Sequence, residues 1–521
     1  PWAGGGGGRW RNGPLQDIAL EQMAAMKKFH ELDIPHSGFY AEGAGATFYG
    51  EYKKEELYKV VSFGERHGFK VFSWQFPNMT QELAQELLPE CPKEELPITR
   101  NKNDEEEKLP VYIDFSHPRA KELLAAQWKD RMDAGIRGSM VDFGDVVPDE
   151  AVFYDGRRGD EMHNAYAYQY AKNYRELFEQ KYGDDHVLYT RGAAPGSQHF
   201  ACQFGGDQLT SFQGLKYAIA GGLSAAASGL PFWGVDAGGY DGFPDQETYL
   251  RWTEYAAFCP LMRFHGTEPR EPWEYDAFTV KVYRYYAWLR ENLRPYIVSV
   301  AAEAHKLGIP MMRPLAMMYP EDQEATKVWD EYLFGEDLLV APVSDETEER
   351  EIYFPEGRWI SLWNLNDEIS GPVQRSVGVP IDKIPVYIRE GSFLPLRLNE
   401  SLKLGESMSE SETEMILAVV PQNDSIVKET LYERSGAKTC CGMEKNGETI
   451  QLQISGRTAE LYVMLAGIHW KNTEAIVNGR TLTKVTAREG LYFTEGYLEL
   501  EEGILVKINP SAESVIKIQK K

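Results

Sequence analysis

The chain has 521 residues and a formal net charge of −25 at pH 7, because 80 acidic side chains outnumber 55 basic ones. With 43% hydrophobic and 12% aromatic residues it has the composition of a globular protein built from several domains. The excess of acidic side chains argues against nucleic acid and against an anionic membrane surface as partners.

Cysteine usage limits the chemistry further. The five cysteines are an odd number, and no two of them are spaced as a CxxC pair. Zinc sites and disulfide frameworks usually show such pairing, so we expect no zinc or other metal site, no disulfide scaffold and no cofactor. The cysteines are Cys91, Cys202, Cys259, Cys440 and Cys441.

The sequence carries no recognisable targeting segment. No apolar run reaches the roughly 18 residues that a membrane-spanning helix needs, and no signal peptide is visible. These observations favour a cytoplasmic protein. The chain opens with Pro1-Trp-Ala-Gly-Gly-Gly-Gly-Gly8, an abrupt start that leaves open whether further residues precede it.

The first part of the chain alternates short apolar strands with amphipathic helices. Such alternation implies parallel strands, and eight strand–helix units imply a (β/α)8 TIM barrel, which we predict for residues 1–308 with an acidic insertion at about 81–110. An open doubly wound sheet is the alternative, although no GxGxxG motif opens a helix after the first strand. Strands are predicted at 2–10, 34–40, 70–76, 139–143, 186–191, 200–204, 230–235 and 260–264, and helices at 17–32, 54–67, 119–134, 165–182, 214–228, 245–258 and 277–306.

After about residue 309 the pattern changes to short β-rich runs separated by turn residues. Turns are predicted at 355–357, 364–367 and 478–479, and a polar linker rich in Ser and Glu at 399–412. We therefore predict two C-terminal all-β sandwich domains, a proximal one at 309–398 and a distal one at 399–521.

One strand end stands out as a candidate for chemistry. Residues 139–143 predict a buried strand that runs into a turn at Gly144, with Asp142 close to its end. Barrel enzymes place catalytic residues at the carboxyl ends of their strands. An Asp close before a Gly can also simply support a turn.

Polar and aromatic side chains also stand at or just beyond the ends of other predicted strands. Carboxylates, arginines, a histidine and tryptophans suit sugar binding, since flat rings cover sugar faces and charged side chains hold hydroxyls. Taken singly, each also has a structural explanation: a tryptophan can fill a core, a Gly-Asp pair can form a turn, and a histidine can be buried and hydrogen-bonded. The residues are Trp74, Arg191, Asp207, Trp233, Asp236, Arg263 and His265.

Two of the carboxylates could together cleave a glycosidic bond. That reaction needs one ionised and one protonated carboxyl group flanking the bond. Asp142 is expected to be ionised, because Arg191 ends the next strand and a nearby cation lowers the pKa of a carboxyl group. Asp207 follows Gly205 and Gly206, which let the backbone approach a ligand closely, and is the candidate acid/base.

Six segments, in the same order, resemble those of glycoside hydrolase family 31. The resemblance covers roughly residues 1–400, with Gly192 in place of the Ser that usually follows the family's strand-5 arginine. The segments are Met140-Val-Asp-Phe-Gly-Asp145 (with Pro148 and Met162-His-Asn164), Arg191 with Gly196-Ser-Gln198, Gly205-Gly-Asp207, Trp233-Gly-Val-Asp-Ala-Gly-Gly239, Arg263-Phe-His-Gly266, and Met312-Arg-Pro314 through Gly335-Glu-Asp-Leu-Leu-Val-Ala-Pro342.

The resemblance implies an activity and a set of roles. Members are retaining exo-α-glycosidases, so this chain would hydrolyse terminal α-linked sugars, as an α-glucosidase or α-xylosidase does. Asp142 would be the nucleophile and Asp207 the acid/base. The residues that would contact the sugar are Trp74, Arg191, Trp233, Asp236, His265, Phe143, Tyr240 and Glu42.

Two departures from the family pattern bear on specificity. Members that act on glucosides or xylosides usually carry an Asp at the end of the second strand, where this chain has His36-Ser-Gly-Phe-Tyr-Ala-Glu42. Glu42 could replace that Asp, or the sugar could differ at the hydroxyl concerned. Members also usually carry an N-terminal β-sandwich before the barrel, and this sequence begins at the barrel.

Several alternatives remain open on the same fold. Tyr240 after Gly238 and Gly239 resembles the family's sulfoquinovosidases, although the Arg/Trp pair that accompanies it near the second strand is not found. An α-galactosidase or N-acetyl-α-galactosaminidase would also fit. A catalytically inactive carbohydrate-binding protein is the alternative from another class, which the presence of both carboxylates disfavours. We expect an oligosaccharide or glycoside as the partner; whether the chain forms a homo-oligomer stays open.

Overall fold

The computed structural model of the chain describes residues 2–3, 15–41, 54–101, 111–421, 425–457 and 459–521. The chain divides into two compact units. The first comprises Pro1–Ala218, Phe232–Asp245 and Leu261–Asp276, and the second comprises Ile219–Pro231, Gln246–Pro260 and Ala277–Lys521.

The first unit is built around a closed barrel of parallel strands, as the alternating sequence pattern predicts. The strands follow one another around the barrel in chain order, and each pairs in parallel with its neighbours. They are β1 (Trp2–Ala3), β2 (Gly38–Tyr40), β3 (Lys70–Gln75), β7 (Gly138–Val141), β9 (Val187–Thr190), β10 (Cys202–Phe204), β11 (Trp233–Asp236) and β12 (Leu261–Arg263).

Helices alternate with these strands along the chain, and most begin and end close to the predicted residues. They are α2 (Leu15–Glu31), α3 (Lys54–Arg66), α5 (Ala120–Ala134), α6 (Gly159–Tyr182), α7 (Phe212–Ala227), α8 (Gln246–Ala257), α9 (Ala277–Asn292) and α10 (Arg294–Leu307). The prediction of one helix at 277–306 is wrong, because the chain breaks at Leu293 and restarts at Arg294 with Pro295 in the first turn of α10. Proline lacks a backbone N–H and clashes with the preceding helical turn.

The strand register brings the predicted site residues to one end of the barrel. Val141 of β7 is level with Thr190 of β9, so Asp142 and Arg191, the residues that follow them, leave the barrel side by side. Below them the barrel interior is filled by large inward-facing side chains, so the barrel is a packed core with its functional groups above it. The buried members of that cluster are Tyr40, Phe72, Met140, Tyr189 and Phe204.

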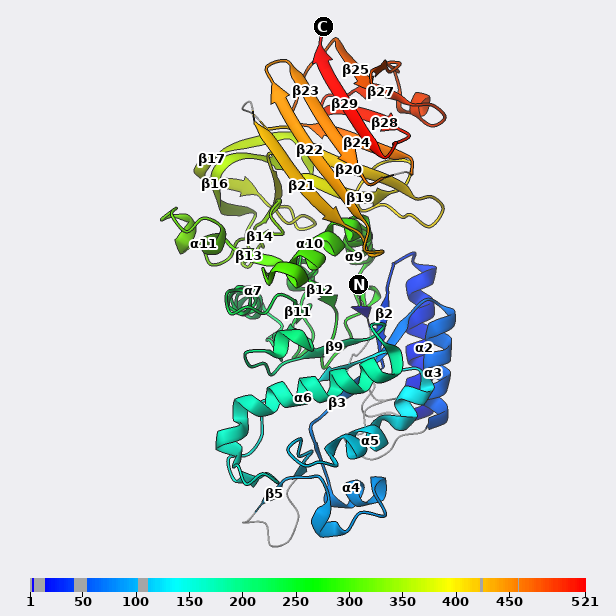
Figure 1. Ribbon diagram of the computed structural model, residues 1–521, viewed down its shortest axis with the longest axis vertical. Helices are drawn as coiled ribbons and strands as arrows, with labels where there is room; N and C mark the ends of the chain where they lie inside the picture. The colour runs from blue at the N-terminus through cyan, green and yellow to red at the C-terminus, as the bar shows by residue number, and fades with distance from the viewer. Residues whose placement is uncertain (1, 4–14, 42–53, 102–110, 422–424, 458) are drawn as a thin grey trace. The chain divides into compact units, whose positions relative to one another are not determined.

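The described residues between β3 and α6 include several short elements besides α5 and β7. β4 (Asn78–Met79) pairs with β6 (Val111–Tyr112), and β5 (Arg100–Asn101) pairs with β8 (Ala151–Val152), both antiparallel. In the chain, α4 (Gln81–Leu87) lies between β4 and β5. Thr80 caps its start, because the Thr80 side chain accepts a hydrogen bond from the N–H of Leu83. α4 and β5 appear blue at the lower end of Figure 1.

The β-rich segment that follows α10 forms all-β sheets, as predicted. A six-stranded sheet has the order β13-β14-β15-β18-β16-β17. Its strands are β13 (Met312–Pro314), β14 (Tyr332–Phe334), β15 (Leu338–Val340), β16 (Glu349–Ser361), β17 (Asn364–Gly378) and β18 (Val386–Arg389).

Two of the turn predictions in this sheet are wrong. Residues 355–357 lie inside β16, where the pairing with β17 shifts at a β-bulge between Phe354 and Gly357, and residues 364–367 belong to β17. The chain instead reverses at Leu362 and Trp363. A long antiparallel ribbon can absorb an extra residue as a bulge, so turn-forming residue types do not always end a strand.

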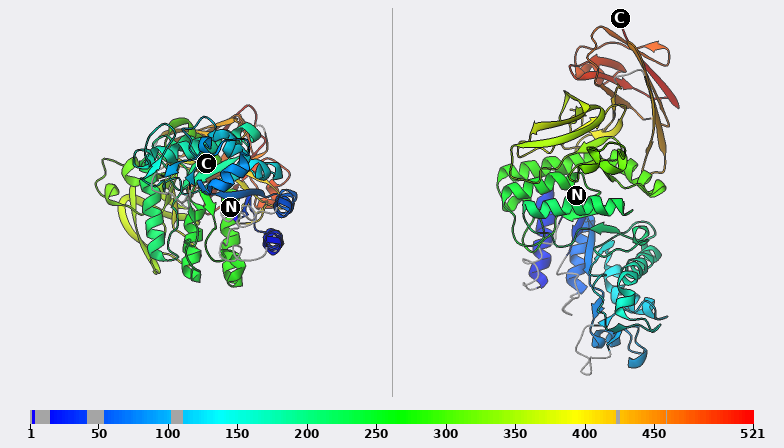
Figure 2. Two further views of the ribbon diagram at one scale, coloured as in Figure 1. Left: turned by 90° about the horizontal axis from the view of Figure 1, so that it is seen from below. Right: turned by 90° about the vertical axis from the view of Figure 1, so that its left-hand side faces the viewer.

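The last part of the chain is a sandwich of two antiparallel-rich sheets with one apolar core, which is drawn in yellow to red in Figures 1 and 2. One sheet has the order β19-β20-β24-β28-β27 and the other β21-β22-β23-β29-β25-β26. The predicted linker at 399–412 is the loop between β19 and β20. The strands are β19 (Phe393–Leu398), β20 (Thr413–Val419), β21 (Ile426–Tyr432), β22 (Lys438–Asn446), β23 (Thr449–Ser455), β24 (Leu461–Ala466), β25 (Thr473–Val477), β26 (Arg480–Thr481), β27 (Gly496–Glu499), β28 (Gly503–Ile508) and β29 (Glu513–Lys520).

Among the described helices, none combines the length and the apolar character needed to cross a lipid bilayer.

Candidate active site

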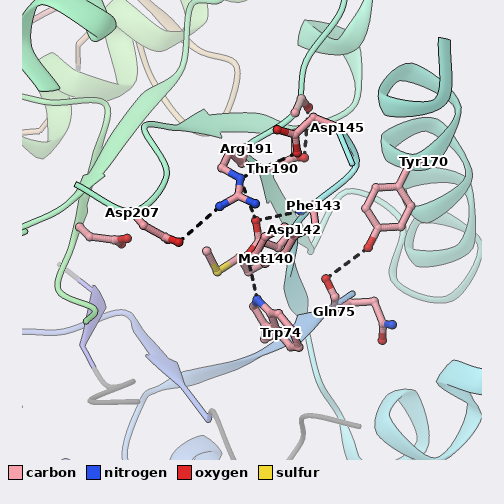
Figure 3. A network of polar contacts seen from close by, with 12 residues as sticks. Trp74, Gln75, Met140, Asp142, Phe143, Asp145, Tyr170, Thr190, Arg191 and Asp207 are labelled. Carbon is pink, nitrogen blue, oxygen red and sulfur yellow. Dashed lines mark hydrogen bonds and ion pairs between the residues drawn. The ribbon is translucent and has the colours of Figure 1, made fainter. Parts of the chain in front are cut away.

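Asp142 lies at the carboxyl end of β7 and is held by three hydrogen bonds. Its backbone N–H donates to the carbonyl of Gln75 at 3.0 Å. The indole Nε1 of Trp74 donates to its Oδ2 at 3.1 Å, and the backbone N–H of Phe143 donates to its Oδ1 at 2.9 Å. Only 3% of Asp142 is exposed. These hydrogen bonds hold the carboxylate in position, and Figure 3 draws its contacts with Trp74 and Phe143.

The pKa of Asp142 is raised above its ordinary value, contrary to our expectation that Arg191 would lower it. Burial is the largest cause, since it removes water from the charged form, and the charge of Asp207 adds to the effect. Arg191, the Trp74 indole and the Phe143 N–H all act in the opposite direction, but together they do not outweigh burial.

Arg191 joins the two candidate catalytic carboxylates. Its Nε lies 3.6 Å from Oδ1 of Asp142 and its Nη1 lies 3.5 Å from Oδ2 of Asp207. A third carboxylate, that of Asp145, lies 3.8 Å from the same Nε. The guanidinium also stacks on Phe143, with its central carbon 3.8 Å from the ring centroid. A single cation thus spans the space between Asp142 and Asp207 (Figure 3).

Asp207 occupies a more open position than Asp142. Its side chain is 44% exposed, against 5% for that of Asp142. Gly206, immediately before it, has a φ of 76°, a conformation that glycine adopts without strain. A Cβ at Gly206 would lie 2.8 Å from Cδ of Arg191, so this turn approaches the arginine as closely as a glycine permits.

Asp236, at the end of β11, is completely buried and forms an ion pair with Arg263 of β12. The two residues are level in the strand register. Burial, with repulsion from Asp207 and Asp142, raises the pKa of Asp236 to about 7, although the charge of Arg263 acts against the rise. Arg263 lies over the ring of Tyr189, with 4.8 Å between its central carbon and the centroid, so it is confined between strands.

Aromatic rings surround the carboxylates. Phe143 has a φ of 55°, in the left-handed region that non-glycine residues seldom adopt. Its ring centroid lies 4.4 Å from that of Phe76 and 6.5 Å from that of Trp74. The unusual backbone turns the ring of Phe143 under Arg191, and the indole of Trp74 faces Asp142.

The remaining predicted residues stand on strands 7 and 8. His265 is 2% exposed, and its ring lies 4.9 Å from that of Tyr40 and 5.3 Å from that of Tyr240. Trp233 is buried, and a Cβ at Gly205 would lie 3.0 Å from its ring, so it supports the turn that leads to Asp207.

The structure therefore gathers five predicted residues into one contact network: Trp74, Asp142, Phe143, Arg191 and Asp207. A second group comprises Asp236, His265 and Tyr240 on the neighbouring strand ends, with Trp233 behind the turn before Asp207. Glu42 lies outside the described residues.

Two charged residues of this site were not among the residues predicted to act on or contact the sugar. Asp145 lies three positions after Asp142 in the motif on which the resemblance rests, and that proximity was the available signal. Arg263 ends the eighth predicted strand, but its partnership with Asp236 depends on a strand register that a single sequence does not reveal. Among the described residues, no cluster of three or more His, Cys, Asp or Glu side chains is arranged to hold a metal ion.

Two models of one protein family together match most of the chain. The glycosyl hydrolases family 31 TIM-barrel domain matches residues 16–300, and the glycosyl hydrolase family 31 C-terminal domain matches residues 308–394.

Curated relatives carry several activities. The chain is 31% identical over 430 residues to an isomaltosyltransferase of Sporosarcina globispora, covering 78% of this chain and 39% of that protein. It is 32% identical to an α-xylosidase of Emericella nidulans, covering 54% of this chain and 38% of that protein. A sulfoquinovosidase of Escherichia coli K12 is also 32% identical, with 54% and 43% covered. The chain thus spans about two fifths of the length of these relatives.

Solved structures share the fold. The cycloalternan-forming enzyme of Listeria monocytogenes, in complex with a pentasaccharide substrate, matches 100% of this chain and 54% of its own with a TM-score of 0.87 at 22% identity. A Flavobacterium johnsoniae dextranase complexed with glucose also has a TM-score of 0.87 at 22% identity, covering 100% of this chain and 70% of its own.

Proposed function

Because this chain belongs to glycoside hydrolase family 31, we propose that it is a retaining exo-α-glycosidase of the α-glucosidase or α-xylosidase type. It removes the terminal α-linked sugar of an oligosaccharide or glycoside by double displacement. The observation that carries the proposal is the guanidinium of Arg191, which contacts the buried carboxylate of Asp142 on one side and the exposed carboxyl group of Asp207 on the other.

In the first step Asp142 acts as the nucleophile. Its ionised Oδ attacks the anomeric carbon while the bond to the leaving oxygen breaks, and protonated Asp207 gives its proton to that oxygen. The fixed position of Asp142 suits this role, since its hydrogen bonds hold the attacking group in place. The products are a glycosyl ester on Asp142 and the released alcohol.

In the second step Asp207, now ionised, takes a proton from water. The water oxygen attacks the anomeric carbon, the bond to Asp142 breaks, and Asp207 ends protonated as it began. The greater exposure of the Asp207 side chain, 44%, gives water access to this carboxyl group. Two inversions leave the sugar in its original α configuration.

The second group of residues supports recognition of the sugar. Asp236 and His265 stand at the ends of the strands that follow Asp207 and present polar atoms on the same side of the barrel. Trp74 and Phe143 supply flat apolar surfaces beside Asp142, and such rings commonly stack on sugar faces.

Transfer to a sugar acceptor is a second candidate outcome of the same chemistry. The isomaltosyltransferase relative aligns with 78% of this chain, more than the α-xylosidase or the sulfoquinovosidase. In a transferase the hydroxyl group of a second sugar replaces water in the second step, and Asp207 takes its proton instead. The two activities differ in the acceptor of the second step and therefore in their products.

The test is hydrolysis of a panel of p-nitrophenyl α-glycosides: glucoside, xyloside, galactoside, N-acetylgalactosaminide and sulfoquinovoside. We expect release from the glucoside or the xyloside, with the α-anomer of the free sugar appearing first by proton NMR. Appearance of the β-anomer first would overturn the retaining mechanism. Longer saccharides among the products would favour transfer over hydrolysis, and a silent panel would overturn the proposed function.

A further inference from the structure

The loop after β11 is held between the loops that follow β10 and β12. Its central residue, Tyr240, donates its N–H to the carbonyl of Gln208 at 2.8 Å, and its own carbonyl accepts from the N–H of Thr267 at 2.8 Å. The side chain of Thr210 donates to the carbonyl of Asp241 at 2.8 Å. The three loops therefore form one hydrogen-bonded layer above the barrel.

The side chain of Arg270 binds backbone carbonyls in two of these loops, those after β11 and β12. It is 3% exposed, and its guanidinium lies within hydrogen-bonding distance of five backbone carbonyls. Three of them belong to the loop after β11: Gly239 at 2.8 Å, Tyr240 at 3.1 Å and Gly242 at 2.6 Å. Only a planar group with several N–H donors can reach so many acceptors at once.

The fit around Arg270 leaves little freedom. A Cβ at Gly238 would lie 3.3 Å from Cδ of Arg270, and one at Gly266 would lie 2.5 Å from its Nη2. The backbone thus closes around the guanidinium on two sides. A smaller or differently shaped cation in this space would leave backbone carbonyls without donors, which is costly in a buried site.

Asp207 is the residue immediately before Gln208, where the loop after β10 meets this layer. It follows the paired glycines 205–206, whose backbone is intrinsically free, and its charged contact in the network of Figure 3 is the 3.5 Å approach to Arg191. On its other side, Gln208 is held by the N–H of Tyr240, whose carbonyl Arg270 binds. One hydrogen-bonded path thus runs from Arg270 through Tyr240 to the residue next to Asp207.

We propose that Arg270 is a positioning residue for the acid/base: through the loop after β11, it holds the Asp207 carboxyl group where it can protonate the leaving oxygen. This inference rests on the proposed function, because it takes Asp207 as the acid/base. In this proposal Arg270 acts without contacting the sugar, because it is 3% exposed and its guanidinium binds backbone carbonyls. Its loss would impair the proton transfer selectively and leave the attack by Asp142 intact.

The selective effect can be measured by comparing substrates whose leaving groups differ in their need for protonation. A p-nitrophenolate departs without protonation, whereas an alkyl alcohol needs the acid. In Arg270→Lys the positive charge remains but the planar fork is lost. We expect kcat/KM for a methyl or disaccharide α-glycoside to fall at least about tenfold more than kcat/KM for the p-nitrophenyl glycoside of the same sugar, since general acid catalysis is worth roughly 10²–10⁴-fold.

A second readout does not depend on turnover. Amide hydrogen exchange of the segment 205–211 should be faster in Arg270→Lys than in the wild type, because the two bonds that tie it to the loop after β11 would open more often. These bonds run from the Tyr240 N–H to the Gln208 carbonyl and from the Thr210 hydroxyl to the Asp241 carbonyl. Arg270→Ala, if it folds, should show a larger effect in the same segment.

Arg251→Lys is the matched control. Arg251 is also a buried arginine, 2% exposed, that binds backbone carbonyls, those of Val379 at 2.8 Å and Pro380 at 3.1 Å. It contacts none of the loops that follow β10, β11 and β12 in the described contacts. The control should lose stability without a leaving-group preference and without faster exchange at 205–211.

The outcomes separate the two proposals. Selective loss on the poor leaving group together with faster exchange at 205–211 supports the positioning role. Equal loss on both substrates, or unchanged exchange, overturns it and leaves the proposed function standing. A wild-type protein that hydrolyses no α-glycoside overturns the proposed function and the role of Arg270 with it.

Discussion

The indole of Trp74 donates a hydrogen bond of 3.1 Å to the carboxylate of Asp142, the residue proposed as the nucleophile. This hydrogen bond lowers the pKa of Asp142, which burial has raised. Each contact that stabilises the ionised form keeps the carboxylate available for attack. The charge of Arg191 and the N–H of Phe143 act in the same direction.

Removing that donor should shift the pH profile. In Trp74→Phe the ring is kept and the N–H is lost, so the pKa of Asp142 rises further. Because Asp142 must be ionised, the acid limb of kcat/KM moves to higher pH, and activity at a given acidic pH falls. A hydrogen bond to a charged group is worth about 1.5–3 kcal/mol, so we expect a substantial loss. The measurement is the pH dependence of kcat/KM.

Trp128→Phe provides the matched control for this change. Trp128 is buried in the first unit, and its Nε1 donates to the hydroxyl of Tyr174 at 3.1 Å and not to a carboxylate of the site. This substitution also removes one indole donor. It should lower stability without moving the acid limb; an equal movement in both variants would show that the shift comes from general loosening.

The two proposed catalytic carboxylates should respond differently to substitution. Asp142→Ala should abolish turnover of every α-glycoside, because no covalent intermediate can form. Asp207→Ala should keep attack on p-nitrophenyl glycosides but lose roughly 10²–10⁴-fold on alkyl glycosides. Neither variant should unfold the chain, since both carboxylates stand at strand ends above the packed barrel interior. Circular dichroism and steady-state kinetics test this pattern.

Added azide distinguishes the roles further. An anionic nucleophile needs no base, so it should speed the second step in Asp207→Ala and yield an α-glycosyl azide. Full activity in Asp142→Ala, or rescue of Asp142→Ala to an α-configured azide, would refute the assignment of the nucleophile.

Gly206 should be sensitive for a steric reason. Gly206 and Gly156 both have positive φ, 76° and 87°, so alanine at either should cost a comparable amount in strain, about 1–2 kcal/mol. At Gly206 the new Cβ would also lie 2.8 Å from Cδ of Arg191, whereas Gly156 has no atom within 4 Å. Gly206→Ala should therefore displace the arginine between the carboxylates and lower kcat strongly.

Comparison of the two variants separates the effect of backbone strain from the effect of contact with Arg191. Gly156→Ala should lose melting temperature through the same backbone strain but keep wild-type kinetics. A misplacement of about 1 Å can cost about 10²-fold in rate. If the two variants lost activity equally, contact with Arg191 would not be the reason.

The barrel could be predicted from the sequence because strand–helix alternation is a local signal repeated along the chain. The carboxyl ends of parallel strands meet at one side of the barrel, so Asp142, Arg191 and Asp207 could be placed together without coordinates. The turn at 478–479 was also correct, since Asn478 and Gly479 both have positive φ, as a tight hairpin turn requires.

Long-range relationships could not be predicted. The ion pair of Asp236 with Arg263 follows from a register between two strands that the sequence does not specify. The pKa of Asp142 depends on burial, which reverses the effect expected from Arg191 alone. The role proposed for Arg270 depends on carbonyls 28 to 31 positions earlier in the chain. The division of the chain into domains at 308 and 398 stays a prediction.

The sharing of Arg191 among three carboxylates has a consequence for what the site will accept. Asp142, Asp145 and Asp207 surround one guanidinium. The negative charge that these three carboxyl groups can carry exceeds the single positive charge of Arg191. A sugar ring that gains positive character on its way to the glycosyl ester is stabilised there more than the neutral ring is. A basic nitrogen in place of the ring oxygen would carry that charge permanently. Iminosugars should thus be strong inhibitors of this protein, and acidic sugars poor ligands.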